Sequence, residues 1–168
     1  GMGGAQPMAN ADASLIVSYN GEIYNFAEVR AELQAHGHKF RTHGDTEVIL
    51  HAYRQWGEAC VERFNGMFAF ALYEAATQSL WLVRDRLGVK PLHYAQVSDG
   101  SVIFGSELKA LLVHPLLRRA PDLSAVEDYI ALGYVPDDAC IVAGVKKLGA
   151  GEHLRLVRGR GMAAPRRW

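Results

Sequence analysis

The sequence has few cysteines and no long apolar run. Cys60 and Cys140 are the only thiols, and neither lies in a Cys-x-x-Cys or Cys/His spacing. This scarcity excludes a disulfide framework and a zinc site built on paired thiolates. No apolar run reaches the length of a membrane span, and residues 1–10 lack the charged and apolar regions of a signal peptide. We therefore expect an unexported cytoplasmic protein with no membrane partner.

The chain also lacks an excess of charge of either sign. Its 18 Lys and Arg residues balance 18 Asp and Glu residues, so no long-range field favours nucleic acid, and Arg166-Arg167 is too short to bind it. A length of 168 residues fits one domain. We predict a domain over residues 1–157, followed by a tail or interdomain linker over residues 158–168, where Gly, Arg, Ala and Pro dominate.

Alternating apolar residues predict the strands at the centre of the fold. Ser14 to Tyr19 is typical of a strand, and Asn20-Gly21 after it predicts a hairpin turn into a short strand from Glu22 to Tyr24. From Gly66 the run Met-Phe-Ala-Phe-Ala-Leu-Tyr is apolar on both alternating faces. Such a strand is covered on both sides, so we place it in the core.

Further strands and four helices complete the pattern. Strands are expected at 80–83, 92–97 and 102–104, with Asp99-Gly100 as a hairpin turn, and their order predicts an antiparallel meander. Helices are expected after the caps Asn25, Asp45 and Ser106, and over residues 124–132, closed by Gly133. Helices at both ends of an antiparallel strand set indicate a layered α+β fold.

Six motifs in order carry a family resemblance. They are Asn-Gly-Glu-Ile-Tyr-Asn (Asn20 to Asn25), Gly-Asp-Thr-Glu-Val-Ile-Leu (Gly44 to Leu50), Asn-Gly-Met-Phe-Ala-Phe-Ala (Asn65 to Ala71), Arg-Asp-Arg-Leu-Gly-Val-Lys-Pro-Leu (Arg84 to Leu92), Phe-Gly-Ser-Glu-Leu-Lys-Ala-Leu-Leu (Phe104 to Leu112) and Gly-Val-Lys-Lys-Leu (Gly144 to Leu148). Together they resemble the glutamine-hydrolysing domain of asparagine synthetase. Phosphoribosyl and glucosamine phosphate amidotransferases are rival assignments, and Glu22-Ile23-Tyr24 favours asparagine synthetase.

The resemblance implies an N-terminal-nucleophile (Ntn) hydrolase, a four-layer αββα sandwich of antiparallel sheets, here incomplete at its N-terminal strands. In such enzymes a leading cysteine attacks the glutamine amide, and the α-amino group, with a pKa of about 8, serves as base. Gln6-Pro7-Met8 matches the family after that opening, and Gly1 has no nucleophile. Residues 1–157 are therefore expected to be a partial glutamine amidotransferase type 2 domain without the cysteine and a carboxylate-gripping arginine.

The resemblance also assigns roles to four residues. The Asn20 side-chain amide and the Gly21 backbone amide are expected to form the oxyanion hole. Glu22 and Asp45 are expected to bind the amino group of glutamine as buried anionic acceptors. The residues alone leave simpler interpretations open, with Asn20-Gly21 as a type I′ turn and Asp45 as a helix cap. The cap and ligand roles of Asp45 are compatible, because a carboxylate has two oxygens.

Other reactive side chains receive structural interpretations. We expect Cys60 to be a buried, inert thiol. His36, His38 and His43 have no acidic or thiol partner at ligand spacing, so no metal site is predicted. Arg84-Asp85-Arg86 is expected to form a salt-bridged turn.

Two functional hypotheses follow from the sequence. The first is an asparagine-synthetase-like glutamine amidotransferase domain, which would supply ammonia for asparagine synthesis but is inactive as this chain. Its partners would be glutamine and a synthetase domain, and it would need no cofactor, because ATP and Mg²⁺ are expected only in that other domain. The alternative is a non-catalytic assembly or regulatory module that forms a homo-oligomer through exposed strand edges. Whether Met2 is the biological start stays open.

Overall fold

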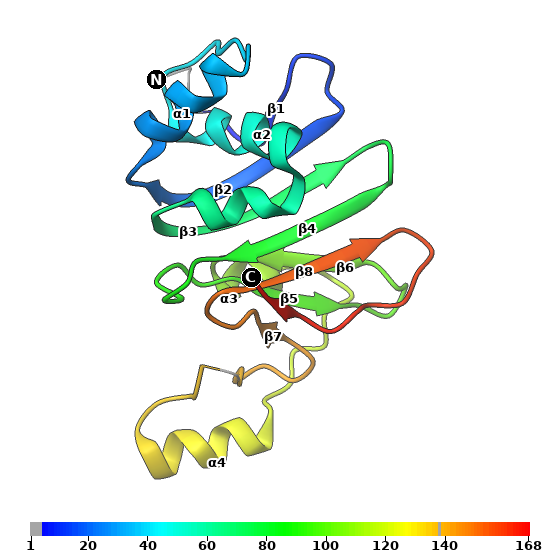
Figure 1. Cartoon of the computed structure of the whole chain (residues 1–168). Helices are drawn as coiled ribbons and strands as arrows, with labels where there is room; N and C mark the ends of the chain where they lie inside the picture. Colours follow the sequence, from blue (N-terminus) through cyan, green and yellow to red (C-terminus); the bar gives the residue numbers. More distant parts are fainter. Residues whose placement is uncertain (1–4, 138) are drawn as a thin grey trace.

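Two antiparallel sheets form the centre of the computed structural model, which describes residues 5–137 and 139–168 (Figure 1). The larger sheet has the order β1 (Met8–Ala9), β2 (Leu15–Ile23), β3 (Gly66–Glu74), β4 (Ser79–Arg84), β8 (Glu152–Val157) and β9 (Arg166–Arg167). The smaller sheet has the order β6 (Val102–Gly105), β5 (His93–Gln96) and β7 (Lys146–Lys147). Neighbouring strands in both sheets are antiparallel, as predicted.

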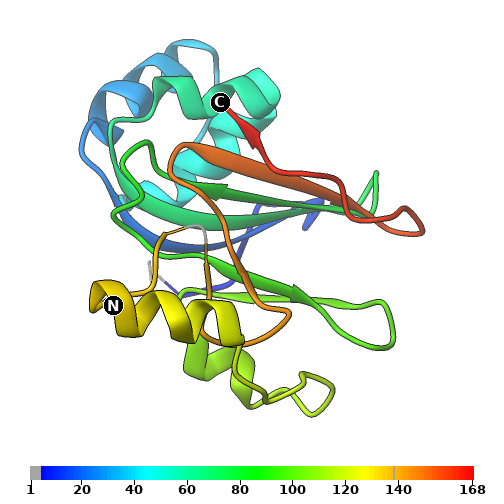
Figure 2. The same ribbon diagram turned by 90° about the horizontal axis from the view of Figure 1, so that it is seen from below.

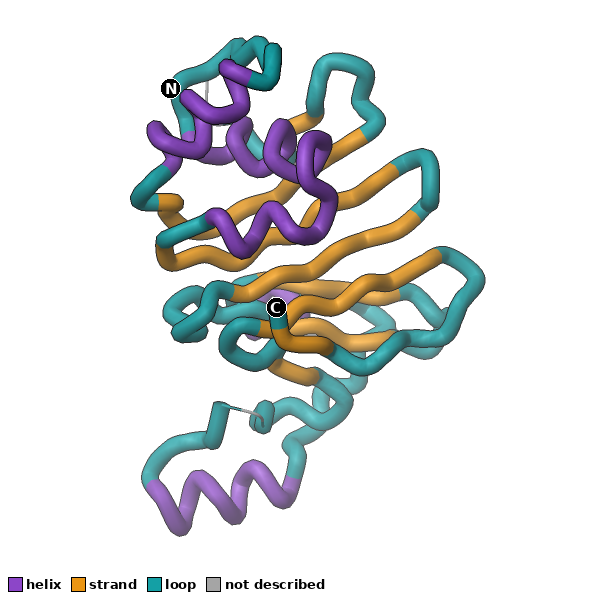
Figure 3. The backbone as a smooth tube through the Cα atoms, in the orientation of Figure 1, coloured by secondary structure: helices purple, strands orange, loops and turns teal. Residues whose placement is uncertain are grey.

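Helices lie on the outer faces of the two sheets. The larger sheet is covered by α1 (Phe26–Ala35), α2 (Asp45–Trp56) and the 3-10 helix η2 (Gly57–Arg63), whereas α3 (Leu108–Leu112) and α4 (Leu123–Leu132) lie beyond the smaller sheet (Figures 1 and 2). The αββα order predicted from the resemblance is thus confirmed. Gly133, with a φ of 81°, ends α4 as expected. Figure 3 shows how far α4 lies from the larger sheet. Within the described residues, no helix has the length and apolarity needed to cross a bilayer.

The strand β3 is covered on both faces, as its sequence predicts. Phe68, Phe70 and Leu72 belong to the apolar cluster under α1 and α2. Ala69 and Ala71 belong to a second cluster that the two sheets share. Both sets are buried, so β3 contributes to two cores at once. A third cluster lies between the smaller sheet and α3.

The predicted hairpin at Asn20-Gly21 is wrong. These residues lie inside β2, which pairs with β3 without interruption from Leu15 opposite Glu74 to Ile23 opposite Gly66. Nine ladder pairs outweigh the local preference of an Asn-Gly pair for a turn. The predicted meander is also wrong, because β4 lies in the larger sheet while β5 and β6 lie in the smaller one. The hairpin at Asp99-Gly100 between β5 and β6 is confirmed.

Asn25 is the N-cap residue of α1, as predicted, whereas the cap predicted at Ser106 is wrong. The Asn25 side chain forms no cap bond; its Oδ1 accepts from the Asn65 amide at 2.9 Å and its Nδ2 donates to the Arg63 carbonyl at 2.9 Å. It therefore ties the start of α1 to the loop before β3. Glu107, not Ser106, is the N-cap residue of α3, again without a side-chain bond. In both places the polar side chain is available for contacts distant in sequence.

The end of the predicted tail packs on the larger sheet. Trp168 donates from Nε1 to the Arg84 carbonyl at 3.1 Å and stacks on Phe68 at a centroid distance of 6.1 Å. The Arg86 guanidinium lies 4.8 Å from the centroid of the Trp168 ring. With β9 paired to β8, the expectation of a free tail is wrong for residues 166–168. The domain boundary at residue 157 stays a prediction.

The turn after β4 contains a buried polar network, and Arg84 forms its ion pair with Asp137 instead of within the predicted salt-bridged turn. Asp85 is 1 % exposed, and its carboxylate accepts from four backbone amides, those of Phe68, Leu87, Val89 and Lys90. Arg84 is also buried, and its guanidinium donates to the carbonyls of Gly88, Lys90 and Leu148 and to the Asp137 carboxylate. The charges thus satisfy backbone groups that water cannot reach.

Replacing Asp85 with Asn should lower the free energy of unfolding by about 3 kcal/mol or more, because an amide nitrogen cannot accept and buried N–H groups lose their anionic partner. Urea denaturation at neutral pH measures this loss. The matched control is Asp99→Asn, since Asp99 bonds one exposed amide, that of Ser101, in a turn that also suits Asn. Equal losses in the two variants would contradict this role for Asp85.

Candidate functional site

One edge of β2 is open beyond the short strand β1. The Tyr19 amide donates to Gln6 Oε1 at 2.5 Å, and the Ile23 amide donates to Asp45 Oδ2 at 3.1 Å. Both amides therefore point away from β3. Amides of alternate residues point to the same edge of a strand. The Gly21 amide, halfway between them, thus points to the open edge, where a ligand oxygen can reach it.

Glycine is the only residue type that fits at position 21. Its φ is 151°, and a Cβ there would lie 2.2 Å from the Met67 carbonyl oxygen and 2.6 Å from Phe68 Cα. Real Cβ atoms do not come so close to backbone atoms. The tight approach of β2 to β3 therefore requires glycine, and it leaves no side chain at residue 21 to shield the free amide.

The Asn20 side chain leaves β2 on the face toward the smaller sheet. It is exposed and lines a cavity of about 150 Å³, together with Ser18 of the same strand, Phe104 of β6 and Ser106, which follows β6. Asn20 and Gly21 thus present a side-chain amide and a backbone amide from adjacent residues. Two convergent N–H donors are what an oxyanion hole requires. The oxyanion role itself stays a prediction.

Asp45 reaches β2 instead of capping its own helix. It is the first residue of α2, the N-cap residue is Gly44, and no side-chain cap bond forms. The Asp45 carboxylate is half-buried, and its Oδ2 accepts from the Tyr19 hydroxyl at 2.5 Å and from the Ile23 amide at 3.1 Å. The capping role is therefore wrong. The structure instead places this carboxylate beside the open edge that carries the Gly21 amide.

Glu22 does not match the expected burial. Its side chain is exposed, and it leaves β2 on the same face as Asn20, two residues away. The expected burial is therefore wrong for Glu22 and only partly right for the half-buried Asp45, and the glutamine-binding role of both residues stays a prediction. An exposed carboxylate can still attract a cation, but water screens its charge.

The two thiols lie in apolar clusters of the interior. Cys60 is 0 % exposed in the cluster under α2, as predicted, and burial raises the pKa of its thiol. Cys140 is 8 % exposed in the cluster around α3. His38 contacts His51 and Gln55 of α2. Among the described residues, no three His, Cys, Asp or Glu side chains converge as a metal site would need.

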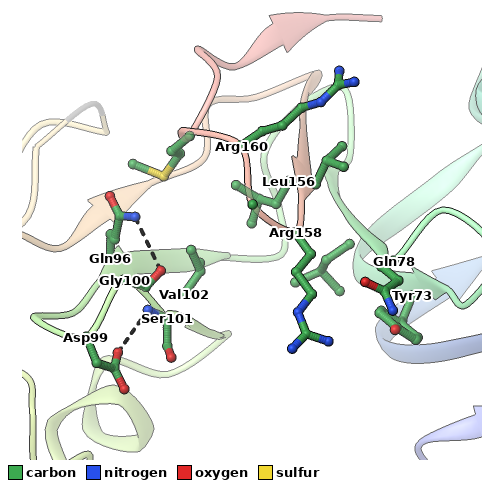
Figure 4. Close-up of a pocket in the computed structure, with 14 residues that line it drawn as sticks. Tyr73, Gln78, Gln96, Asp99, Gly100, Ser101, Val102, Leu156, Arg158 and Arg160 are labelled. Carbon is green, nitrogen blue, oxygen red and sulfur yellow. Dashed lines mark hydrogen bonds between the residues drawn. The ribbon is translucent and has the colours of Figure 1, made fainter.

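A larger cavity of about 600 Å³ lies elsewhere, between the β3–β4 hairpin, the β5–β6 hairpin and the segment after β8 (Figure 4). Arg158 lies between the two hairpins in this view. Two polar groups of the cavity hold the β5–β6 turn, because Asp99 accepts from the Ser101 amide and Gln96 donates to the Gly100 carbonyl. None of the four predicted site residues lines this cavity.

A family assignment agrees with this geometry. Residues 2–168 match the family described as a glutamine amidotransferase domain. The chain belongs to this family. As a glutamine amidotransferase domain it is similar to asparagine synthetase 3 (glutamine-hydrolyzing) of Bacillus subtilis (strain 168), with 46 % identity over 134 residues that cover 78 % of this chain. It is also 37 % identical to asparagine synthetase 1 of the same organism over 153 residues, or 91 % of this chain.

The chain covers only a small part of these relatives. It spans 22 % of Bacillus subtilis asparagine synthetase 3 and 24 % of asparagine synthetase 1. Rice (Oryza sativa subsp. japonica) asparagine synthetase 2 is 47 % identical over 108 residues, which cover 64 % of this chain and 18 % of that protein. The likeness to asparagine synthetases, inferred from six motifs, is thereby confirmed.

Solved structures support the fold. Glutamine phosphoribosylpyrophosphate amidotransferase from B. subtilis superposes with a TM-score of 0.65 and 21 % identity, covering 99 % of this chain and 32 % of that one. An allosteric regulatory enzyme of purine biosynthesis superposes with a TM-score of 0.67 and 20 % identity, over 98 % of this chain and 31 % of that one. This amidotransferase domain therefore has the Ntn-hydrolase fold.

The sequence pattern did not indicate three further residues of the site region. Tyr19 reads as an ordinary inward strand residue, Gln6 only as part of a matching motif, and Ser106 as a helix cap. Their contacts join elements far apart in the chain, such as the bond between Gln6 and the Tyr19 amide. Periodicity assigns a residue to a face but cannot name its partner.

Replacing Gly21 with Ala should destabilise the domain by about 2 kcal/mol or more, because the new Cβ would collide with the backbone of β3 and meet a disfavoured φ. The midpoint of thermal unfolding measures the effect. Gly161→Ala is the control, since a Cβ there meets no atom within 4 Å. A Gly21→Ala variant as stable as Gly161→Ala would contradict the close approach of β2 to β3.

Proposed function

We propose that this domain binds glutamine at the open edge of β2, as the amidotransferase part of an asparagine-synthetase-like protein. In the whole protein, glutamine hydrolysis would supply ammonia for asparagine synthesis in a synthetase domain. ATP and Mg²⁺ would be needed only in that domain. The two buried free thiols fit a reducing cytoplasm.

A single arrangement carries the proposal. The Gly21 amide and the Asp45 carboxylate lie at one strand edge that no neighbouring strand covers, and the Asn20 side chain leaves the adjacent residue of β2 on the face toward the smaller sheet. The two N–H groups suit an amide oxygen that gains negative charge, and the carboxylate suits an ammonium group. An α-amino acid with a side-chain amide carries both of these groups. Glu22 adds an exposed negative charge on the neighbouring face.

We further propose that these 168 residues do not hydrolyse glutamine by themselves. The reaction needs a thiolate beside the bound amide, and both thiols of the chain are buried in clusters that exclude Asn20 and Gly21. Burial also raises the pKa of the Cys60 thiol, which keeps it protonated and unreactive at neutral pH. A cysteine from outside these residues would have to complete the site.

A second candidate function is a non-catalytic assembly or regulatory module. The open edge favours it, because β1 pairs only with Ile16 and Val17 of β2 and β9 pairs only with Glu152 and His153 of β8. Unpaired strand edges can add a strand from another chain. A homo-oligomer whose formation survives saturation with glutamine would support this function.

Isothermal titration calorimetry with L-glutamine tests the first proposal. We expect binding that Asp45→Asn weakens by about tenfold or more, because it removes a charge-assisted partner of the ammonium group. Glu22→Gln should weaken binding less, since Glu22 is exposed. Glu127→Gln, on the distant helix α4, is the control and should change nothing.

An ammonia-release assay tests the second part. We expect no release above the rate without protein, for the unchanged chain and for Cys60→Ser and Cys140→Ser alike. Steady release that either serine variant abolishes would contradict the inactivity of this chain. Absence of glutamine binding in the calorimeter would contradict the site.

A further inference from the structure

Tyr19 links the strand β2 to the helix α2 through a single contact. Its hydroxyl donates to Asp45 Oδ2 at 2.5 Å across a separation of 26 residues. The tyrosine is 8 % exposed, and its ring belongs to the cluster under α1 and α2. Packing therefore fixes the ring, and the ring in turn fixes where its hydroxyl can donate.

The chemistry of the pair makes Tyr19 the donor. Burial and then the hydrogen bond to Asp45 raise the pKa of the Tyr19 phenol, and the charge of Asp45 raises it further. The phenol thus stays protonated at neutral pH, and its O–H group donates a hydrogen bond to the carboxylate. Hydrogen bonds with one charged member are about twice as strong as neutral ones.

The second donor to Asp45 completes the arrangement. The Ile23 amide donates to the same oxygen, Oδ2, at 3.1 Å. Among residues 5–137 and 139–168, no donor reaches the other oxygen, Oδ1. Tyr19 and Ile23 lie on either side of Gly21 in β2. The two donors therefore hold one carboxylate oxygen and leave the other beside the open edge.

We propose that Tyr19 is a positioning residue for glutamine: its hydroxyl holds Asp45 so that Oδ1 faces the ammonium group of a ligand at the Gly21 edge. This inference rests on the proposed function. Tyr19 itself does not touch the ligand. Its effect should therefore depend on the ammonium group and on the Asp45 carboxylate, and should be absent when either is missing.

The experiment compares two ligands by calorimetry, L-glutamine and 5-amino-5-oxopentanoate, which is glutamine without its amino group. Tyr19→Phe should weaken L-glutamine binding by about tenfold, or about 1.4 kcal/mol. Its affinity for the deaminated ligand should equal that of the unchanged protein. Tyr24→Phe is the matched control, because Tyr24 is 56 % exposed just beyond β2, and it should leave both affinities unchanged.

A double-mutant cycle makes the test specific to the Tyr19–Asp45 contact. In an Asp45→Asn background, Tyr19→Phe should cause no further loss of L-glutamine affinity. If Tyr19→Phe weakened the binding of both ligands equally, the positioning role would be overturned. The same loss of L-glutamine affinity with and without Asp45→Asn would also overturn it. An unchanged L-glutamine affinity in Tyr19→Phe would overturn it as well.

A second measurement separates this inference from the proposed function. If the unchanged protein binds no glutamine, the proposed function fails, and hydrogen exchange of the Ile23 amide then tests the contact alone. Exchange that is faster in Tyr19→Phe than in Tyr24→Phe would support the hold of Tyr19 on Asp45, because a freed carboxylate also releases this amide. Equal exchange rates in the two variants would overturn it.

Discussion

The close pairing of β2 with β3 determines the rest of this structure. Gly21 and Gly66 allow it from opposite strands, since a Cβ on either would lie 2.2 Å from a carbonyl oxygen of the other strand. The pairing commits one edge of β2 to β3. The other edge is left for side-chain contacts and for the Gly21 amide. The same pairing buries both faces of β3, on which the helix layer and the smaller sheet pack.

Several polar contacts connect parts of the chain that are distant in sequence. Asp85 accepts hydrogen bonds from four backbone amides, including that of Phe68. Trp168, at the end of the chain, donates to the Arg84 carbonyl and stacks on Phe68. The hydrogen bond between Tyr19 and Asp45 connects β2 and α2. Buried polar groups need such partners, so these contacts constrain how the layers fit together. The geometry of the candidate site depends on the contact between Tyr19 and Asp45.

Much of this fold was predictable from local pattern. The doubly apolar run after Gly66 indicated a strand between two layers, and Asp99-Gly100 indicated a hairpin, because burial and turn chemistry act within a few residues. The hairpin predicted at Asn20-Gly21 was wrong because that prediction also rested on local preference alone. A pair of residues with turn preference cannot show that the next strand will run alongside it for nine residues. The division of β4, β5 and β6 between two sheets was hidden for the same reason.

The sequence by itself determined the family and, through the family resemblance, the antiparallel αββα class, since motifs and periodicity are properties of the chain. The site roles of Asn20, Gly21 and Asp45 stay predictions. Only the tertiary structure decided which edge of β2 is open, that Asp45 bonds a strand instead of its own helix, that Glu22 is exposed and that Tyr19 belongs with Asp45. Each of these depends on which distant backbone lies alongside, and long-range packing, not local preference, sets that choice.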